Sequence, residues 1–315
     1  MSLFRFVLLL IFSLPVLAQD WPNKPVKFVS PYPPGGSVDP LARMLGAKLG
    51  ESLKQNFIVE NRTGASGVIG TEYVAKSAPD GYTFVFIFDT HAVHQALNPK
   101  LPFDPVKDFT PVMIVGTAPM AITTGAQKPY KNFQDALGAA KKDKVSLGNV
   151  GNGSLAHLTT IVLNQAAGTK FEPVAYKGGG PLSADLIGGH VDLAMASTAA
   201  QAQHVRSGKM RALALTGDKR SHTMPDVPTL KELGIDVVAH AWWGILAPAG
   251  TPKSIIDKFH AELVKAIKLP DVNKMLTDTQ GMDVVALSPD ATQKWIVDNM
   301  NRWGKVVRDN NIRAE

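Results

Sequence analysis

The chain has 315 residues and no cysteine, and its 33 Lys and Arg against 27 Asp and Glu give a formal net charge of +6. This length exceeds that of a typical single domain and favours two lobes, each with its own core. The basic residues are spread along the chain, which argues against nucleic-acid binding. The lack of cysteine excludes disulfides and a lipid-anchored lipoprotein, and it suits an oxidising compartment.

The first 18 residues have the pattern of a signal peptide. Arg5 precedes a continuous apolar run over 6–14, Pro15 ends this run, and a plausible cleavage point follows Ala18. The run is shorter than the ~20 residues that a membrane-spanning helix needs. We therefore expect residues 1–18 to be removed and the mature protein to be periplasmic.

The mature chain begins with strands that alternate with helices. The β-branched run VKFVSPY is followed by the turn YPPGG and the helical pattern LARMLGAKLGESL. A second strand, NFIVENR, precedes the helix IGTEYVAKSA, and the apolar strand TFVFIF lies between Gly81 and Asp89. This alternation predicts an α/β fold with a parallel sheet covered on both faces.

The pattern restarts after residue 110. PVMIVGTAPMAITT predicts a pair of strands that cross to a second lobe, and the chain returns over 239–246. Between these crossings, helices over 132–140, 155–167 and 181–187 alternate with short apolar strands, and the chain after Lys253 is mainly helical. The predicted boundaries are residues 1–18 for the signal peptide, 19–120 plus 243–315 for lobe 1, and 121–242 for lobe 2.

The turn YPPGGSVDP, residues 32–40, lies where a predicted strand ends and a helix begins. Gly35 and Gly36 let a ligand approach backbone N–H groups, and Asp39 before Pro40 is typical of an N-cap with proline at the first helical position. The N-terminus of a helix favours an anion. An ordinary tight turn explains these residues equally well.

A similar turn, GNVGNGSLAH, occurs in the second predicted lobe. Two helix starts, one in each lobe, predict a clamp around one anion. Gly151, Gly153 and Ala156 also match G-x-G-x-x-G/A, with Glu172 near the usual acidic position of a dinucleotide site. The match is short, and a secreted protein meets little nicotinamide cofactor, so an NAD-dependent oxidoreductase is a remote alternative and no cofactor is expected.

Patterns for catalysis and metal binding are weak. Neither Ser66 nor Ser154 stands in G-x-S-x-G, and His157 lies on the same predicted helix as Ser154. His91 and His94 lack the Glu and the third ligand of a zinc site. We expect no enzyme activity, no catalytic residue and no metal, with both histidines structural or solvated.

Three further features lie in the second half of the chain. The turn YKGGG suggests close backbone packing or ligand approach, with Tyr176 as an aromatic wall or hydroxyl. Asp185 and Asp192 are expected as cap or surface residues. Trp242 and Trp243, at the return crossing, are expected in hinge packing.

These pieces, in this order, resemble the Bug family of periplasmic solute-binding receptors of tripartite tricarboxylate transporters (TctC-like). The resemblance implies an α/β, two-lobed periplasmic binding protein of the Venus flytrap type with two linking hinge strands. It implies capture of a dicarboxylate, tricarboxylate, acidic amino acid or aromatic acid by a monomer that serves membrane carrier subunits; a sensor using the same cleft is the alternative. The motifs that carry it are YPPGGSVDPLAR, VENRTGASGVIG, FDPVKDFTPV, YKGGGPLSADLIGGHVDL, VRSGKMRALALT, PDVPTLKELG and GILAPAGTPKSI.

The resemblance also implies where the ligand binds. Backbone N–H groups of the two turns would hold a ligand carboxylate, and other residues would recognise the far end of the ligand. Asp89 departs from the family pattern. Its carboxylate would pair with an amino group of the ligand or repel a second ligand carboxylate. The expected ligand-binding residues are Tyr32, Pro34, Gly35, Gly36 and Asp39 opposite Gly153, Ser154 and His157, with Asp89, Thr90, Tyr176, Ser197 and Thr198 at the far end.

Overall fold

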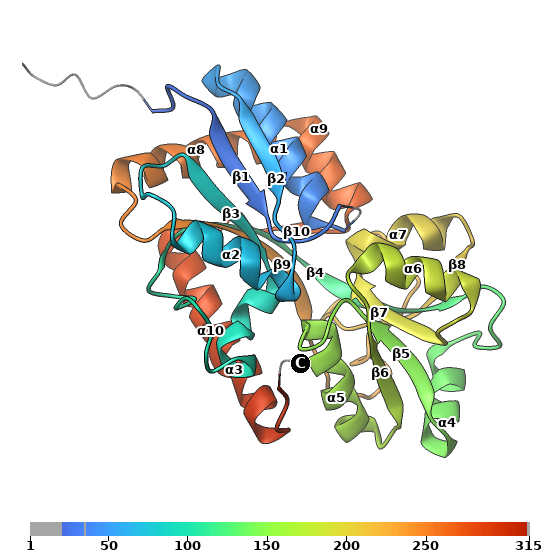
Figure 1. Ribbon diagram of the computed structural model, residues 1–315. Coiled ribbons are helices and arrows are strands. Elements are labelled where there is room, and N and C mark those ends of the chain that lie inside the picture. The colour runs from blue at the N-terminus through green and yellow to red at the C-terminus, as the bar shows by residue number, and fades with distance from the viewer. Residues whose placement is uncertain (1–20, 35, 314–315) are drawn as a thin grey trace, which may run out of the picture.

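The computed structural model describes residues 21–34 and 36–313. The predicted signal peptide and Gly35 lie outside the described residues. Two sheets that share one long strand organise the chain into two lobes, which lie side by side in Figure 1.

The first sheet has the strand order β2-β1-β3-β9-β4, and β10 adds to β4. β1 runs parallel to β2 and β3, as expected, whereas β9 lies antiparallel between β3 and β4. The strands are β1 Val26–Ser30, β2 Phe57–Asn61, β3 Thr83–Phe88, β4 Phe109–Gly125, β9 His240–Pro248 and β10 Asp283–Val284.

Alternate side chains of β3 bury on opposite faces of this sheet, as a strand covered on both sides requires. Phe84 and Phe86 face a cluster that includes Phe259, whose ring centroid lies 4.2 Å from that of Phe84. Val85 and Ile87 belong to the cluster of the other face. The covering helices are α1 Val38–Leu53, α8 Lys253–Lys268 and α9 Pro270–Lys274, and α2 Val68–Ala75, α3 His94–Leu97 and α10 Pro289–Asp309.

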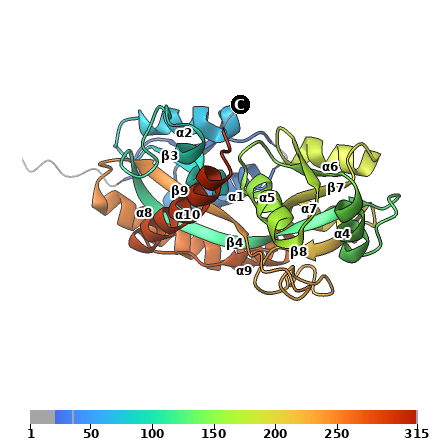
Figure 2. The same ribbon diagram turned by 90° about the horizontal axis from the view of Figure 1, so that it is seen from below.

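Strand β4 corrects one expectation. The predicted pair of strands is a single strand of 17 residues that continues from the first sheet into the second. Its first part pairs with β9, and its last part pairs with β7 and β8. Shifts of register near Pro111 and after Ile114 and Ile122 bend the strand without ending it. Figure 2 shows β4 running through both lobes.

The second sheet has the order β4-β7-β5-β6, with β8 also on β4. Its helix over Leu155–Ala167 has the predicted bounds, and Asn132 caps the preceding helix through a capping box with Asp135. The elements are β5 Val145–Asn149, β6 Phe171–Ala175, β7 Leu193–Ser197 and β8 Met210–Leu215, with α4 Phe133–Lys142, α5 Leu155–Ala167, α6 Gly179–Gly188 and α7 Thr198–Arg206.

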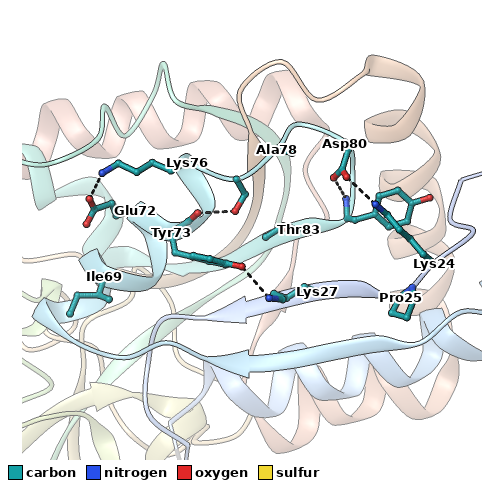
Figure 3. A pocket seen from close by; sticks show the side chains of 12 residues that line it. Lys24, Pro25, Lys27, Ile69, Glu72, Tyr73, Lys76, Ala78, Asp80 and Thr83 are labelled. Atoms are coloured by element: carbon teal, nitrogen blue, oxygen red, sulfur yellow. Dashed lines mark hydrogen bonds and ion pairs between the residues drawn. The ribbon is translucent and has the colours of Figure 1, made fainter.

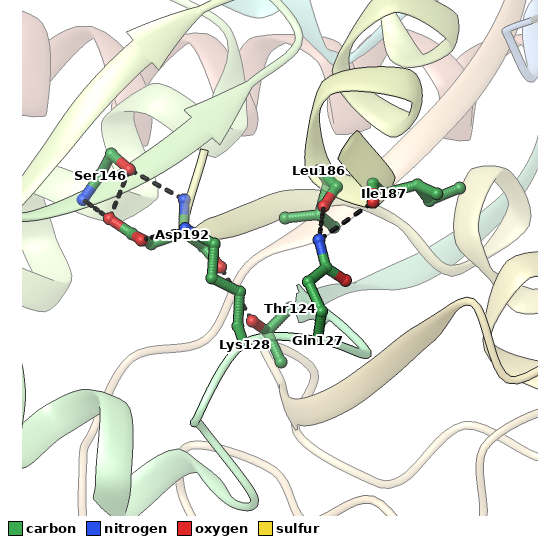
Figure 4. Close-up of polar contacts among 7 residues, drawn as sticks. All are labelled: Thr124, Gln127, Lys128, Ser146, Leu186, Ile187 and Asp192. Atoms are coloured by element: carbon green, nitrogen blue, oxygen red, sulfur yellow. Dashed lines mark hydrogen bonds and ion pairs between the residues drawn. The ribbon is translucent and has the colours of Figure 1, made fainter. Parts of the chain in front are cut away.

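Asp192 is neither a cap nor a free surface residue. Its carboxylate accepts hydrogen bonds from Ser146 N–H at 3.2 Å and Ser146 Oγ at 2.7 Å, and it pairs with Lys128 Nζ at 2.7 Å (Figure 4). Burial opposes its ionisation, but these contacts prevail and hold the pKa of Asp192 below its usual range. Asp192 therefore ties β5 to the start of β7 and to the end of β4.

Candidate functional site

The candidate residues follow the carboxyl ends of strands, which is the edge where open α/β sheets bind ligands. In the first sheet these are the segments after β1 and β3. In the second sheet they are the segments after β5, β6 and β7. The segment after β3 and the start of α5 meet where the two lobes come together in Figure 1.

Hydrogen bonds fix the turn after β1. Tyr32 Oη and Thr90 Oγ1 lie 2.5 Å apart, so the turn is tied to the segment after β3. Asn61 Nδ2 donates to the Tyr32 carbonyl at 3.1 Å, and Trp243 Nε1 donates to Ser37 Oγ at 3.0 Å beside the start of α1. Burial, opposed by the Thr90 bond, raises the pKa of Tyr32, which therefore stays neutral.

Asp39 is not the N-cap that the sequence suggested. Helix α1 begins at Val38, with Ser37 at the N-cap position, and Asp39 lies buried in the first turn. Its carboxylate accepts hydrogen bonds from Arg43 Nε at 2.9 Å and Asn61 Nδ2 at 2.8 Å. Burial opposes its ionisation, but these bonds outweigh it and hold the pKa of Asp39 below its usual range. Asp39 thus orients Asn61, which in turn holds the Tyr32 carbonyl.

We expect the Asp39→Ala variant to lose about 1–3 kcal/mol of folding stability, because Asn61 and Arg43 lose their shared acceptor. Ligand affinity should fall as well, since the Tyr32 turn loosens. Urea denaturation and calorimetric titration measure the two effects. Asp257→Ala is the matched control: it removes another i,i+4 pair, with Lys253, but both side chains are more than half exposed, so a change below ~1 kcal/mol is expected. Equal losses in both variants would contradict this role of Asp39.

The turn after β5 uses several of its own donors. Gly153 N–H donates to His157 Nδ1 at 2.9 Å, and Gly151 N–H donates to Asn149 Oδ1 at 3.0 Å. Ser154 Oγ accepts from His157 N–H at 3.3 Å and is the N-cap of α5. This turn is therefore held rigid by its own side chains.

Asp89 of the first lobe faces the start of α5 in the second lobe. Its side chain is buried, with 3% of the residue exposed. Burial raises the pKa of Asp89 well above its usual range, although hydrogen bonds from the backbone N–H groups of Leu155 and Thr90 partly oppose this. Asp89 Oδ1 has no hydrogen-bond partner among the described residues. The lobes therefore meet around a carboxyl group with at least one oxygen left unsatisfied by the described residues.

Glycines mark further places where the lobes touch. A Cβ atom on Gly153, which has φ +72°, would overlap Leu97 Cδ1 of the first lobe. A Cβ on Gly151 would lie 3.4 Å from Ser66 Oγ, and one on Gly178 would lie 3.4 Å from Pro33 Cγ. The structure is thus closed at the edge where the candidate residues gather.

Sequence reasoning missed the segment η1, Ala65–Gly67, as part of this edge. Gly64, Ala65, Ser66 and Gly67 have consecutive φ values of +134°, +45°, +53° and +97°. Such backbone strain in residues with side chains is concentrated at functional sites. The signal in the sequence was the pair of flanking glycines, which permits this conformation.

His91 and His94 are structural, as expected. His91 Nε2 lies 2.9 Å from the Pro105 carbonyl oxygen, and His94 Nε2 lies 3.0 Å from that of Ser66. Burial, helped by the neighbouring His94, lowers the pKa of His91 to about 3. Burial lowers the pKa of His94 to about 4. Both rings are therefore neutral at physiological pH.

The remaining candidates are not joined to the Tyr32–Asp89 group by a described contact. Tyr176 lies at the end of β6, and its carbonyl oxygen is 3.9 Å from the Cβ position of Gly151. Thr198 Oγ1 is buried without a hydrogen-bond partner among the described residues and lies 3.0 Å from the Cβ position of Gly281, which precedes β10. Ser197 precedes α7, and Pro34 and Gly36 lie in the first turn, where a Cβ on Gly36 would lie 3.8 Å from the Pro33 carbonyl oxygen. The binding roles of these residues stay predictions.

The acidic residue of the dinucleotide alternative lies at the wrong edge. Glu172 stands near the beginning of β6, not at its carboxyl end, and it pairs with Lys144 Nζ at 2.9 Å. In a dinucleotide site, the ligand lies beyond the carboxyl ends of the strands. This placement weighs against a ribose contact by Glu172.

A surface hollow of about 760 Å³ lies at the opposite edge of the first sheet (Figure 3). Its lysines already have partners: Lys24 pairs with Asp80, Lys76 pairs with Glu72, and Lys27 contacts Tyr73 and Glu60. The hollow is lined by the starts of β1 and β3, not by their carboxyl ends, and its cations are engaged. It is therefore a poor candidate for an anion site.

Two α/β lobes that close on each other at the carboxyl edges of their sheets define a solute-binding protein. Within the described residues, no helix is long and apolar enough to cross a membrane. The chain belongs to the tripartite tricarboxylate transporter family receptors, because the model of that family matches residues 41–312. The resemblance seen in the sequence is thereby confirmed.

Relatives support the family and the fold. Protein BugT of Bordetella pertussis is 37% identical over 307 residues, which cover 96% of this chain and 94% of that protein. The structure of R. palustris Rpa4515 with adipate is 30% identical with a TM-score of 0.89, and the match covers 93% of this chain and 99% of that one. MatC from Rhodopseudomonas palustris with bound malate is 30% identical with a TM-score of 0.83, and the match covers 91% and 100%. The expected two-lobed binding-protein fold is confirmed.

Proposed function

We propose that this protein captures a small carboxylated solute between its lobes in the periplasm and delivers it, as a monomer and without chemical change, to a membrane carrier of the tripartite tricarboxylate type. The observation that carries the proposal is the meeting of the Tyr32–Thr90–Asp89 group with the start of α5 at the carboxyl edges of both sheets. Adipate and malate, bound by two relatives, are both carboxylates.

Closure has a physical role in this proposal. The turn after β1 is fixed in the first lobe and opens on the N-terminal end of α1, which favours an anion. The second lobe then covers the ligand with the turn before α5. Because both turns are held by their own hydrogen bonds, little conformational entropy is lost when the ligand binds.

A thermal-shift screen tests the proposal with the mature protein and a panel of mono-, di- and tricarboxylates, amino acids, aromatic acids and NAD. A ligand at 100 times its dissociation constant adds ~2.7 kcal/mol, which raises Tm by roughly 5 °C or more in a chain of this size. We expect such a shift with one class of carboxylates. No shift with any acid, or a shift with NAD alone, would overturn the proposed function.

A further inference from the structure

The side chain of Asp89 is exceptional among the acidic groups at the closed edge. It is 3% exposed, comes from the first lobe, and faces the N-terminal end of α5 in the second lobe. Its Oδ1 atom has no hydrogen-bond partner among the described residues. A buried acceptor left without a donor is unusual in a folded protein and needs an explanation, such as a missing ligand.

No positive side chain of the described residues forms an ion pair with Asp89. Arg43 pairs with Asp39 and Lys128 pairs with Asp192, and neither forms an ion pair with Asp89. The negative charge of Asp89 helps to raise the pKa of Tyr32. A buried carboxylate normally has a cation or a set of donors beside it. Here that partner is missing from the described chain.

The N-terminal end of α5 is also already in use. The N–H group of Leu155, at the first position of this helix, faces Asp89 and favours its ionised form, and Ser154 is the N-cap residue, whose Oγ accepts from His157 N–H. A helix start that already faces an unpaired carboxyl group is poorly suited to a second one, whereas the carboxylate in the first turn of α1, that of Asp39, is paired with Arg43. The carboxylate of a ligand is better placed against the first-lobe turn, which leaves Asp89 to the other end of the ligand.

We propose that Asp89 determines the specificity of the site by accepting a hydrogen bond from a donor group, an ammonium above all, at the end of the solute remote from its carboxylate. The solute is then an amino-bearing carboxylate, not a simple α,ω-dicarboxylate such as adipate. This inference rests on the proposed function and adds the chemical class of the second end. The raised pKa of Asp89 agrees with it, since an ammonium would stabilise the ionised carboxylate that burial disfavours.

Matched pairs of ligands test the inference. At pH 7.5, calorimetric titration would compare 6-aminohexanoate with adipate, and 4-aminobutanoate with succinate, which differ only at one end. We expect the amino acid of at least one pair to bind at least 10-fold more tightly than its diacid. Asp89→Asn should weaken the amino acid at least 10-fold and strengthen the diacid, because the amide keeps an acceptor for Leu155 N–H, adds a donor and carries no charge.

Asp236→Asn is the control, because it removes the same charge from an exposed position of the chain. Its ligand preference should equal that of the wild type. The preference of the wild-type protein for the amino acid or the diacid of each pair is measured without any variant. A poorly folded Asp89→Asn protein would therefore not remove the test.

The outcomes separate the inference from the proposed function. Tighter binding of the diacids by the wild type, or an Asp89→Asn variant with unchanged preference, would overturn the inference and leave carboxylate capture in place. Failure of every carboxylate in the wider panel to bind would overturn both. A preference for the amino-bearing ligands that Asp89→Asn abolishes would support both.

Discussion

Replacing Gly153 with alanine will lower ligand affinity by about 100-fold while leaving the protein folded. The added Cβ would overlap Leu97 Cδ1 of the other lobe, and separating the lobes relieves this overlap. Disfavouring the closed form by such a factor reduces the apparent affinity in proportion. Calorimetric titration with a carboxylate that passes the thermal screen measures the loss, and small-angle scattering reports the open form.

Gly168→Ala is the matched control. Gly153 lies just before the N-cap of α5, and Gly168 is the C-cap residue of the same helix. Gly168 has φ +63°, close to the +72° of Gly153, but no atom of the described residues lies within 4 Å of its Cβ position. Both substitutions therefore introduce similar backbone strain, about 1 kcal/mol, and one of them alone meets the other lobe. Trimming the partner in a Gly153→Ala, Leu97→Ala double variant should restore part of the affinity. Equal affinities of the two alanine variants would show that this contact is not needed for closure.

Lowering the pH from 7.5 to 5.5 will remove roughly 2–3 kcal/mol of folding stability through two buried histidines. The pKa values of His91 and His94 are about 3 and about 4 in the folded protein, against about 6.5 in the unfolded chain. Below pH 6.5 the unfolded chain binds protons that the folded protein does not, so stability falls as the pH falls, by ~1.4 kcal/mol per unit for each histidine.

Urea denaturation at several pH values measures this slope. His94→Gln should flatten it by about half, whereas His190→Gln, at an exposed position, should leave it unchanged. Asp89 acts in the opposite direction, because its raised pKa removes stability as the pH rises through that value. The lowered pKa of Asp39 changes the folding stability at pH values below 5.5. An unchanged slope between pH 7.5 and 5.5 in the His94→Gln variant would show that His94 is not buried in its neutral form.

The sequence predicted the fold well where the signal was local. The alternation of strands and helices, and the bounds of α5, follow from hydrophobic spacing and from the cap at Ser154. The prediction of two strands in place of β4 was wrong. Proline and glycine inside this strand resemble the residues that end strands, whereas the register shifts of β4 accommodate them. Asp39 was misplaced as an N-cap, because its real partners, Arg43 and Asn61, include one 22 residues away.

The same limit applies to the candidate site, whose binding residues stay predictions. Both glycine-rich turns are visible in the sequence, and they lie at the edges where the lobes meet. The contact between Asp89 and the start of α5 joins parts of the chain that are far apart, so neither composition nor spacing indicates it. The same holds for Leu97 beside Gly153, since a glycine shows where space is short but not which residue fills it.

The position of β9 also affects how the chain assembles during synthesis. Because β9 lies between β3 and β4, the first sheet stays in two unconnected pieces until residues 240–248 have emerged, after every strand of the second sheet. The second sheet needs no later strand and is free to form first. We expect the exposed edges of β3 and β4 to be the segments most open to mispairing in a growing or truncated chain, so a chaperone should bind longest to these two strands.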